Sequence, residues 1–237
     1  MQKEAKLSSL GALDQARVPS VTDMVYDELY RRIVDLDLVP GTKLSEAEVA
    51  SRLEVSRQPV RDAFYRLSQQ GFLSIRPQRA TTVTPISPDA VLQARFIRMA
   101  LEVEIIREAV RLMTPAAMAR LEAIVAAQKP AVESGDRERF HERDDALHME
   151  LCEIAGQPQV WQLIKDNKAH MDRVRYLSLE DGARLAYDEH LSILEAVKAR
   201  DPDLAVSKMR DHLMRIGDVI PDIRAKHAEY FEQDLQN

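Results

Sequence analysis

The amino-acid sequence predicts a mainly α-helical protein in two parts: a small N-terminal unit of short helices with a β-hairpin, and an all-α bundle of about six helices. Composition is the first reason, because 7 glycines and 5% aromatic residues in 237 are few for an all-β fold or a glycine-looped α/β fold. Apolar residues that recur at helical spacing along most of the chain are the second. The third is one strand-like stretch, 72–84, with prolines at 85 and 88 beyond it.

The N-terminal unit begins with a predicted helix in which Val25, Leu29, Ile33 and Leu36 recur at helical spacing. The tripeptide VPG at 39–41 ends this run. Ser45 and Glu48 then fit a capping box at the start of a short second helix, since each side chain can satisfy the other's free backbone N–H.

A third helix is expected from Ser56, which fits an N-cap. Its predicted inner face consists of Val60, Ala63, Phe64 and Leu67, and its outer face of Arg57, Arg61, Tyr65 and Ser68. Gly71 ends the helix, and two strands at 72–75 and 81–84 complete the unit. Two short helices joined by a tight turn and followed by a hairpin predict a winged helix-turn-helix.

Charge along this unit favours nucleic acid as its partner. The whole chain has a net charge of -6, yet residues 56–85 contain five arginines and one acidic residue, Asp62. Arginine pairs with guanine edges or with phosphate, and Arg57 and Arg61 lie one helical turn apart. We expect both to remain unpaired within the protein because the duplex supplies their counter-charges. The alternative is a small helical domain with a solvated arginine face.

Residues 43–75, KLSEAEVASRLEVSRQPVRDAFYRLSQQGFLSI, closely resemble the DNA-binding domain of the GntR family of bacterial transcription regulators. The match includes its L-x-V-S-R-x-P-V-R-x-A-x-x-x-L-x-x-x-G core. The resemblance implies that Arg57 and Arg61 are the main base and phosphate contacts, and that Ser56, Gln58 and Pro59 lie at the same interface.

Two positions depart from the family pattern. Ala47 replaces an arginine that contacts DNA in some relatives, and Ala80 replaces a glycine common at the wing tip, where glycine permits a tight turn. Arg79 is therefore assigned as a minor-groove or phosphate contact that depends on how the wing approaches DNA.

The prolines at 85 and 88 mark a domain boundary. The predicted divisions are a flexible segment 1–20, a DNA-binding domain 21–85 and a helical domain 86–237. Ser87 and Pro88 start its first helix. Later starts are marked by Thr114-Pro115, Gly135-Asp136, Gln157-Pro158, Asp181-Gly182 and Asp201-Pro202.

Four polar residues occupy apolar stripes of these helices: Asp144 and His148 one turn apart, then His190 and His212. A buried carboxylate and three imidazoles are costly without partners, and one divalent cation satisfies all four. An Asp/His₃ set suits Zn²⁺ or another first-row metal. Any single inward histidine is also compatible with an ordinary hydrogen-bonded core residue. The remaining histidines, at 141, 170 and 227, are assigned to surface or supporting roles.

The same region resembles the FCD domain, the ligand-binding domain of the FadR branch of GntR regulators, in its shorter VanR-like form. The resemblance lies in D-x-x-x-H followed by AGQP, then EHLSILEAV, and MRDHL 22 residues beyond His190. It implies that Asp144, His148, His190 and His212 hold a metal, zinc first and nickel or manganese as alternatives. It also implies a small organic or sugar acid as effector.

Two arginines are candidates for the carboxylate of that effector. Arg98 resembles the family's arginine on the first helix of the domain, and Arg175 follows on the helix after 158. For Arg98, a surface ion pair with Glu102 at i+4 is the competing interpretation.

These observations predict a homodimeric transcription regulator that binds a palindromic operator on double-stranded DNA. The family resemblance implies that it is a repressor and that it responds to an acid bound at its metal. The alternatives are a helical-bundle metalloenzyme and a regulator with a purely structural metal. We expect no enzyme activity, since the sequence has no HExxH run, glycine-rich phosphate loop or second carboxylate pair. The lack of a long apolar run and the single, buried Cys152 predict a cytoplasmic protein without a membrane partner.

Overall fold

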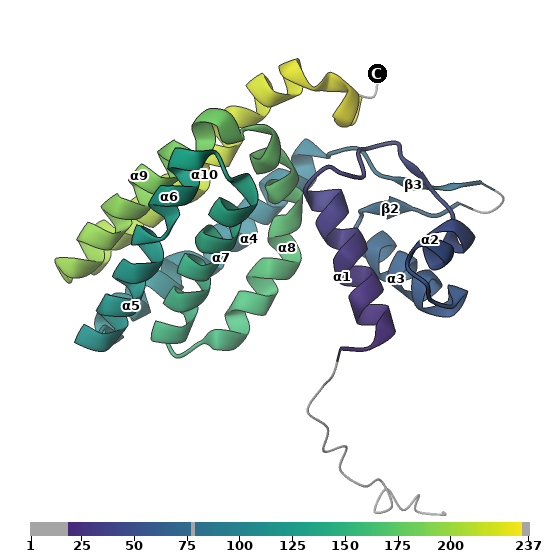
Figure 1. The fold of residues 1–237 in the computed structure, drawn as a ribbon. Coiled ribbons are helices and arrows are strands. Elements are labelled where there is room, and N and C mark those ends of the chain that lie inside the picture. Colours follow the sequence, from purple (N-terminus) through teal and green to yellow (C-terminus); the bar gives the residue numbers. More distant parts are fainter. Residues whose placement is uncertain (1–18, 77–78, 234–237) are drawn as a thin grey trace, which may run out of the picture.

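The computed structural model describes residues 19–76 and 79–233, so residues 1–18 of the predicted flexible segment 1–20 lie outside it. Two lobes lie side by side (Figure 1). The smaller lobe holds residues 21–83 and combines short helices with a sheet, and the larger, residues 88–226, is helical. This confirms the predicted fold class.

The small lobe contains three helices and a three-stranded sheet. They are α1 (Val21–Val34), β1 (Lys43–Leu44), α2 (Glu46–Arg52), α3 (Arg57–Gln69), β2 (Leu73–Ser74) and β3 (Thr81–Val83). The sheet is antiparallel with the order β1-β3-β2, and Lys43 of β1 pairs with Thr82 of β3. The sequence predicted the β2-β3 hairpin but not β1, because α2 and α3 lie between β1 and its partner β3 in the chain and no hairpin turn marks the pairing.

The predicted cap of α2 is wrong, although the helix begins where expected. Ser45 is the N-cap residue but makes no side-chain hydrogen bond. Glu48 lies instead 3.0 Å from Arg52, one turn along the same helix. The capping box occurs at α1, where the Ser20 side chain accepts from the backbone N–H of Asp23 and the Asp23 carboxylate accepts from that of Ser20.

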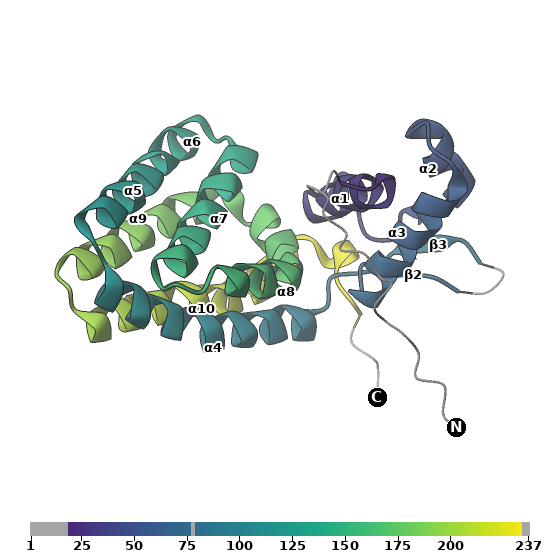
Figure 2. The same cartoon turned by 90° about the horizontal axis from the view of Figure 1, so that it is seen from below.

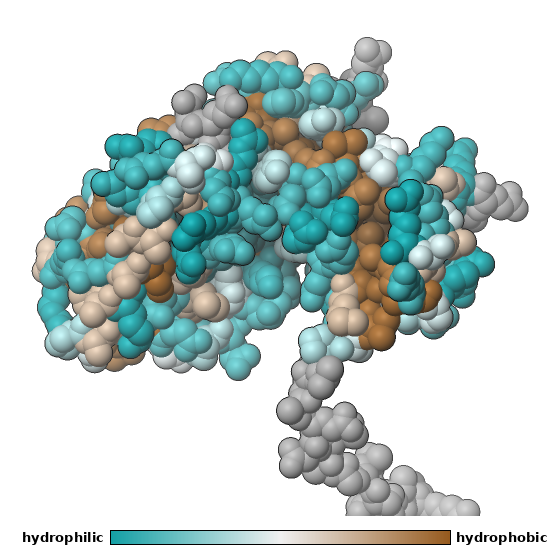
Figure 3. Space-filling model, in the orientation of Figure 1, coloured by the Kyte–Doolittle hydropathy of each residue, from teal (hydrophilic) through white to brown (hydrophobic). Residues whose placement is uncertain are grey.

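The core of the small lobe confirms the two predicted faces of α3. Val60, Ala63, Phe64 and Leu67 are each no more than 1% exposed and pack against α1 and α2. The space-filling view shows a hydrophobic band on this lobe beside α1, whereas the visible face of the bundle is mostly hydrophilic (Figure 3). Arg57 and Arg61 are exposed.

The large lobe has seven α-helices among the described residues. They are α4 (Pro88–Leu112), α5 (Pro115–Ala126), α6 (Gln128–Ser134), α7 (Arg137–Ile154), α8 (Pro158–Leu177), α9 (Leu179–Lys198) and α10 (Pro202–Lys226). Seen from below, α4 and α10 lie along one another (Figure 2). Four predicted starts after Ser87-Pro88 are confirmed, whereas α9 begins at Leu179, before the predicted Asp181-Gly182.

The difference from about six helices is α6, a short helix that follows α5 after Ala127. No glycine or capping side chain separates the two, and the local signal is Pro130 in the first turn of α6, which the prediction did not use. Gly135 ends α6 in the left-handed conformation, with φ of 69°.

Helix α8 belongs to the bundle but also packs against the small lobe. Ala169 lies in the hydrophobic core of the small lobe, and the ring of His170 stacks on Phe72 with centroids 4.4 Å apart. Arg173 donates to the backbone oxygen of Thr84, 2.8 Å away, just before the second lobe begins. The assignment of His170 to a surface or supporting role is thus corrected, because the side chain lies at the junction of the lobes.

The C-terminal tail crosses the linker between the lobes. Phe231 forms a parallel bridge with Ile86, and both side chains are buried. Backbone bonds on either side join the Ile86 N–H to Tyr230 and the Glu232 N–H to Ile86. None of the helices in the described residues has the length and apolar character needed to cross a membrane.

Candidate metal centre and nucleic-acid interface

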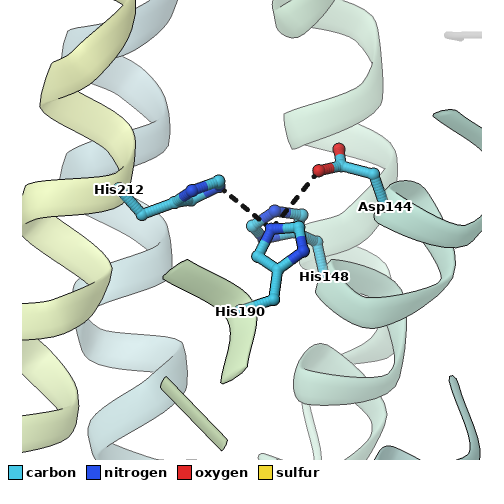
Figure 4. A group of neighbouring side chains, drawn as sticks. All are labelled: Asp144, His148, His190 and His212. Carbon is cyan, nitrogen blue, oxygen red and sulfur yellow. Dashed lines mark hydrogen bonds and ion pairs between the residues drawn. The ribbon is translucent and has the colours of Figure 1, made fainter. Parts of the chain in front are cut away.

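Three helices bring Asp144, His148, His190 and His212 together in the bundle (Figure 4). Asp144 and His148 come from one face of α7, His190 from α9 and His212 from α10. All four are buried, and one ligand atom from each lies within 4.8 Å of all the others. The structure therefore assembles the four residues that the apolar stripes predicted to point inward.

Two of the three histidines are oriented by a hydrogen bond at Nδ1. The oxygen of Gln128 lies 2.8 Å from His190 Nδ1, and that of Glu189 lies 3.0 Å from His212 Nδ1. These acceptors place the proton of His190 and His212 on Nδ1, which leaves the lone pair on Nε2. A Glu102 oxygen also lies 2.5 Å from His148 Nδ1, as an ion-pair contact without the geometry of a hydrogen bond.

The orientation of Gln128 is itself fixed. Its amide nitrogen donates to the backbone oxygen of Arg143, so the amide oxygen faces His190. The sequence did not indicate that three side chains contact the histidines: Gln128, Glu102 and Glu189. They lie on other helices, and for Gln128 and Glu189 the separations in the chain are 62 and 23 positions.

The side chains converge on one point. His190 Nε2 lies 3.4 Å from His212 Nε2 and 3.4 Å from Asp144 Oδ1. Both ring nitrogens of His148 are buried and have no hydrogen-bond partner among the described residues. Three imidazoles and a carboxylate that meet in this way form a site suited to a divalent cation, and an Asp/His₃ set fits zinc.

Burial and neighbouring charges favour the ligating forms of Asp144, His190 and His212. Burial raises the pKa of Asp144, but the guanidinium of Arg175, 2.7 and 2.8 Å from its two oxygens, holds that pKa well below its usual range. Burial lowers the pKa of His190 and of His212. A deprotonated carboxylate and neutral imidazoles are the forms that bind metal.

A cavity of about 760 Å³ opens beside the cluster and includes His212 in its lining. Arg98 and Arg175, the predicted effector arginines, line the same cavity. Neither is free in the structure, because Arg175 holds Asp144 and Arg98 Nε lies 2.5 Å from Glu102 Oε1. The competing interpretation of Arg98 is right about the partner and wrong about the surface, since both side chains are buried.

The outer face of α3 carries the predicted DNA contacts. The side chains of Arg57 and Arg61 are 63% and 58% exposed. The expectation that they remain unpaired is wrong, because Glu46 at the start of α2 lies 3.5 Å from Arg57 and 3.2 Å from Arg61. This pairing spans 11 and 15 positions between two helices, which helical spacing cannot indicate.

The other predicted contacts surround these arginines or lie on the wing. Ser56 is the N-cap residue of α3 without a side-chain bond, Pro59 lies in the first turn, and Gln58 donates to Asp62 at 2.9 Å. Arg79 and Ala80 are exposed, and residues 77–78 of the wing tip lie outside the described residues.

Comparisons with known proteins agree with this architecture. Residues 21–83 match the family of bacterial regulatory proteins named gntR, and residues 93–215 match the FCD domain. The chain is 37% identical to the HTH-type transcriptional repressor RspR of Escherichia coli K12, over 90% of this chain and 95% of that protein. It is 33% identical to an uncharacterised HTH-type regulator of Streptomyces ambofaciens, over 89% of each.

A solved structure shares the fold. Escherichia coli McbR/YncC superposes with a TM-score of 0.73 over 89% of this chain and 100% of that one, at 23% identity. The relatives are regulators by name, which favours a regulator over the metalloenzyme alternative. With both halves matched by one family architecture and a relative aligned along nine-tenths of its length, the chain belongs to the GntR family of bacterial transcription regulators and carries an FCD domain.

Proposed function

We propose that this regulator is a homodimeric repressor whose DNA binding is released when a small carboxylate binds at a metal in the FCD domain. One observation carries the proposal. Three buried histidines and Asp144 each bring a ligand atom within 4.8 Å of the others, and the cluster lies beside a cavity of about 760 Å³. A closed structural site would not need such a cavity.

Four residues would bind the metal, and three others orient them. Asp144, His148, His190 and His212 would hold the cation, and the cation would supply a Lewis-acidic position for a carboxylate oxygen. Glu102, Gln128 and Glu189 keep the imidazoles oriented for that role.

Arg175 connects this site to α8. Its guanidinium binds both oxygens of Asp144 and lies 3.7 Å from Asp172, so an incoming carboxylate can share its charge. Because α8 also contacts the DNA-binding lobe through Ala169 and His170, a shift of Arg175 can alter the placement of that lobe.

A second copy of the chain is expected to bind the bundle. Phe96 on α4 is 73% exposed, and Leu92 on α4 and Met214 on α10 are exposed on the two helices that lie along one another. A two-fold dimer built on such a face would present two α3 helices to inverted half-sites. The relative RspR is named a repressor, which supports the sign of regulation proposed here.

The experiment begins with selection of an operator from random duplex DNA. Operator affinity is then measured for the wild type and for Arg57→Ala and Arg61→Ala, with and without carboxylates on zinc-loaded protein. We expect each arginine variant to weaken binding by about tenfold or more and an acid to release wild-type protein. Unchanged operator affinity in both variants would exclude α3 as the DNA-reading helix. A zinc-loaded protein that retains DNA in every acid would exclude effector control.

A further inference from the structure

The cavity beside the metal cluster reaches the DNA-binding lobe. Its lining includes His212 and Arg175 at one end and Asp35, Leu36 and Asp37 from the small lobe. Asp35 is the C-cap of α1, and Leu36 follows with φ of 59°, a left-handed conformation that turns the chain. An occupant of the cavity can therefore touch both lobes at once.

The two parts of this lining carry different chemistry. Near the cluster, Arg98 and Arg175 are buried cations. The turn after α1 instead presents carboxylates. Asp35 forms an ion pair with Arg31 at 3.6 Å, too far for a hydrogen bond, and Asp37 is exposed, with no ion pair among the described residues. Burial also raises the pKa of Asp35.

Other charges of the lining lie on the bundle. Asp222 and Lys226 come from α10, and Arg137 comes from α7, where its guanidinium lies over the ring of Tyr176 at 5.9 Å. Glu189 of α9 and Arg215 of α10 also line the cavity and pair with one another. Asp222 has no ion pair among the residues that the structure describes. Carboxylates thus offer hydrogen-bond acceptors that a ligand with donor groups can satisfy.

We propose that the effector is an acid whose far end carries hydrogen-bond donors, hydroxyl or ammonium, which Asp35 and Asp37 of the DNA-binding lobe accept. This inference rests on the proposed function, in which the acid group binds at the metal. A second carboxylate at the far end would face like charges and be rejected.

The consequence for regulation is direct. An effector held between the metal and the turn after α1 fixes the position of the lobe that carries α3. The turn both selects the ligand and is held by it, so ligand identity and DNA release depend on the same two carboxylates.

The test uses four acids with six-carbon chains on the zinc-loaded full chain: hexanoate, adipate, 6-aminohexanoate and gluconate. Binding is measured by calorimetry on the wild type and on Asp35→Asn and Asp37→Asn. At least one donor-bearing acid is expected to bind about tenfold more tightly than hexanoate, and adipate more weakly. Comparing 6-aminohexanoate with gluconate distinguishes ammonium from hydroxyl recognition.

Both variants should reduce the preference for the donor-bearing acid over adipate by about threefold or more, since a charge is removed. Asp27→Asn is the matched control, because Asp27 is exposed on α1 and does not line the cavity. If hexanoate binds as tightly as both donor-bearing acids, or if the preference survives in both variants, this inference is overturned while the proposed function stands. If none of the four acids binds the metal-loaded protein, the proposed function fails and the inference with it.

Discussion

Replacing Glu46 with glutamine is expected to strengthen binding to duplex DNA. Glu46 is the carboxylate that contacts both predicted DNA-reading arginines, Arg57 and Arg61. These contacts must be given up when phosphates approach α3, and the carboxylate repels the same phosphates. Glutamine keeps the shape of the side chain and removes its charge.

The magnitude follows from the exposure of the pairs. Both arginine side chains are more than half exposed, and the closest distances to Glu46 are 3.5 and 3.2 Å. Two exposed pairs of this kind are worth together about 0.5–1.5 kcal/mol, a gain of about 2- to 13-fold in DNA affinity. The same change removes an acid from the first turn of α2 and should lower the stability of the fold by about 0.3–1 kcal/mol.

The assay is fluorescence anisotropy with a duplex of random sequence across a salt series, because phosphate contacts alone suffice to reveal the effect. Glu48→Gln is the matched control, since Glu48 lies on the same helix and pairs with Arg52 instead. Equal or weaker DNA binding by Glu46→Gln, with the control unchanged, would show that Glu46 positions the arginines for DNA and would refute the reasoning.

Three further predictions concern the bundle and its junction. The metal-free protein should lose thermal stability as pH falls below about 6.5. Burial lowers the folded-state pKa of His190 and His212, so below this pH the unfolded chain binds more protons than the folded chain. A melting midpoint that stays constant from pH 7.5 to pH 5.5 would contradict this. Arg173→Met should leave the free energy of unfolding in urea unchanged or raise it by about 1–3 kcal/mol. Burial lowers the pKa of Arg173 to about 10, and its Nε and Nη1 have no hydrogen-bond partner among the described residues. A clear loss of stability would show that the hydrogen bond from Arg173 to the Thr84 backbone outweighs the cost of burying the charge. Phe96→Glu should yield monomers in analytical ultracentrifugation, with Leu163→Glu on α8, also exposed, as the control; a dimeric Phe96→Glu protein would place the interface elsewhere.

Local patterns predicted much of the fold. The inner face of α3 and the starts of α5, α7, α8 and α10 follow from apolar spacing and from proline or capping residues at helix ends. The four candidate ligands were found because polar residues interrupted apolar stripes, which is a conflict visible in the sequence alone. Where the local signal was weak, as between α5 and α6, where Pro130 in the first turn of α6 marks the boundary, the boundary was not predicted.

Contacts between distant elements were beyond such patterns. The pairing of Glu46 with Arg57 and Arg61 depends on how α2 packs on α3. Likewise, the burial of Arg98 with Glu102 depends on the helices that cover α4, because helical spacing gives the partner but not the exposure. The Asp35 turn entered the cavity only because the two lobes meet there.

The contacts of α8 with the small lobe also matter for the design of chimaeric regulators. Three residues of α8 belong by sequence to the FCD domain but contact Phe72, Gln70 and Thr84 of the DNA-binding domain: Ala169, His170 and Arg173. A chimaera joined at the linker near residue 86 would place a foreign DNA-binding domain against an α8 surface that fits this one. Transferring the three α8 residues together with the DNA-binding domain should preserve the contacts between the two domains.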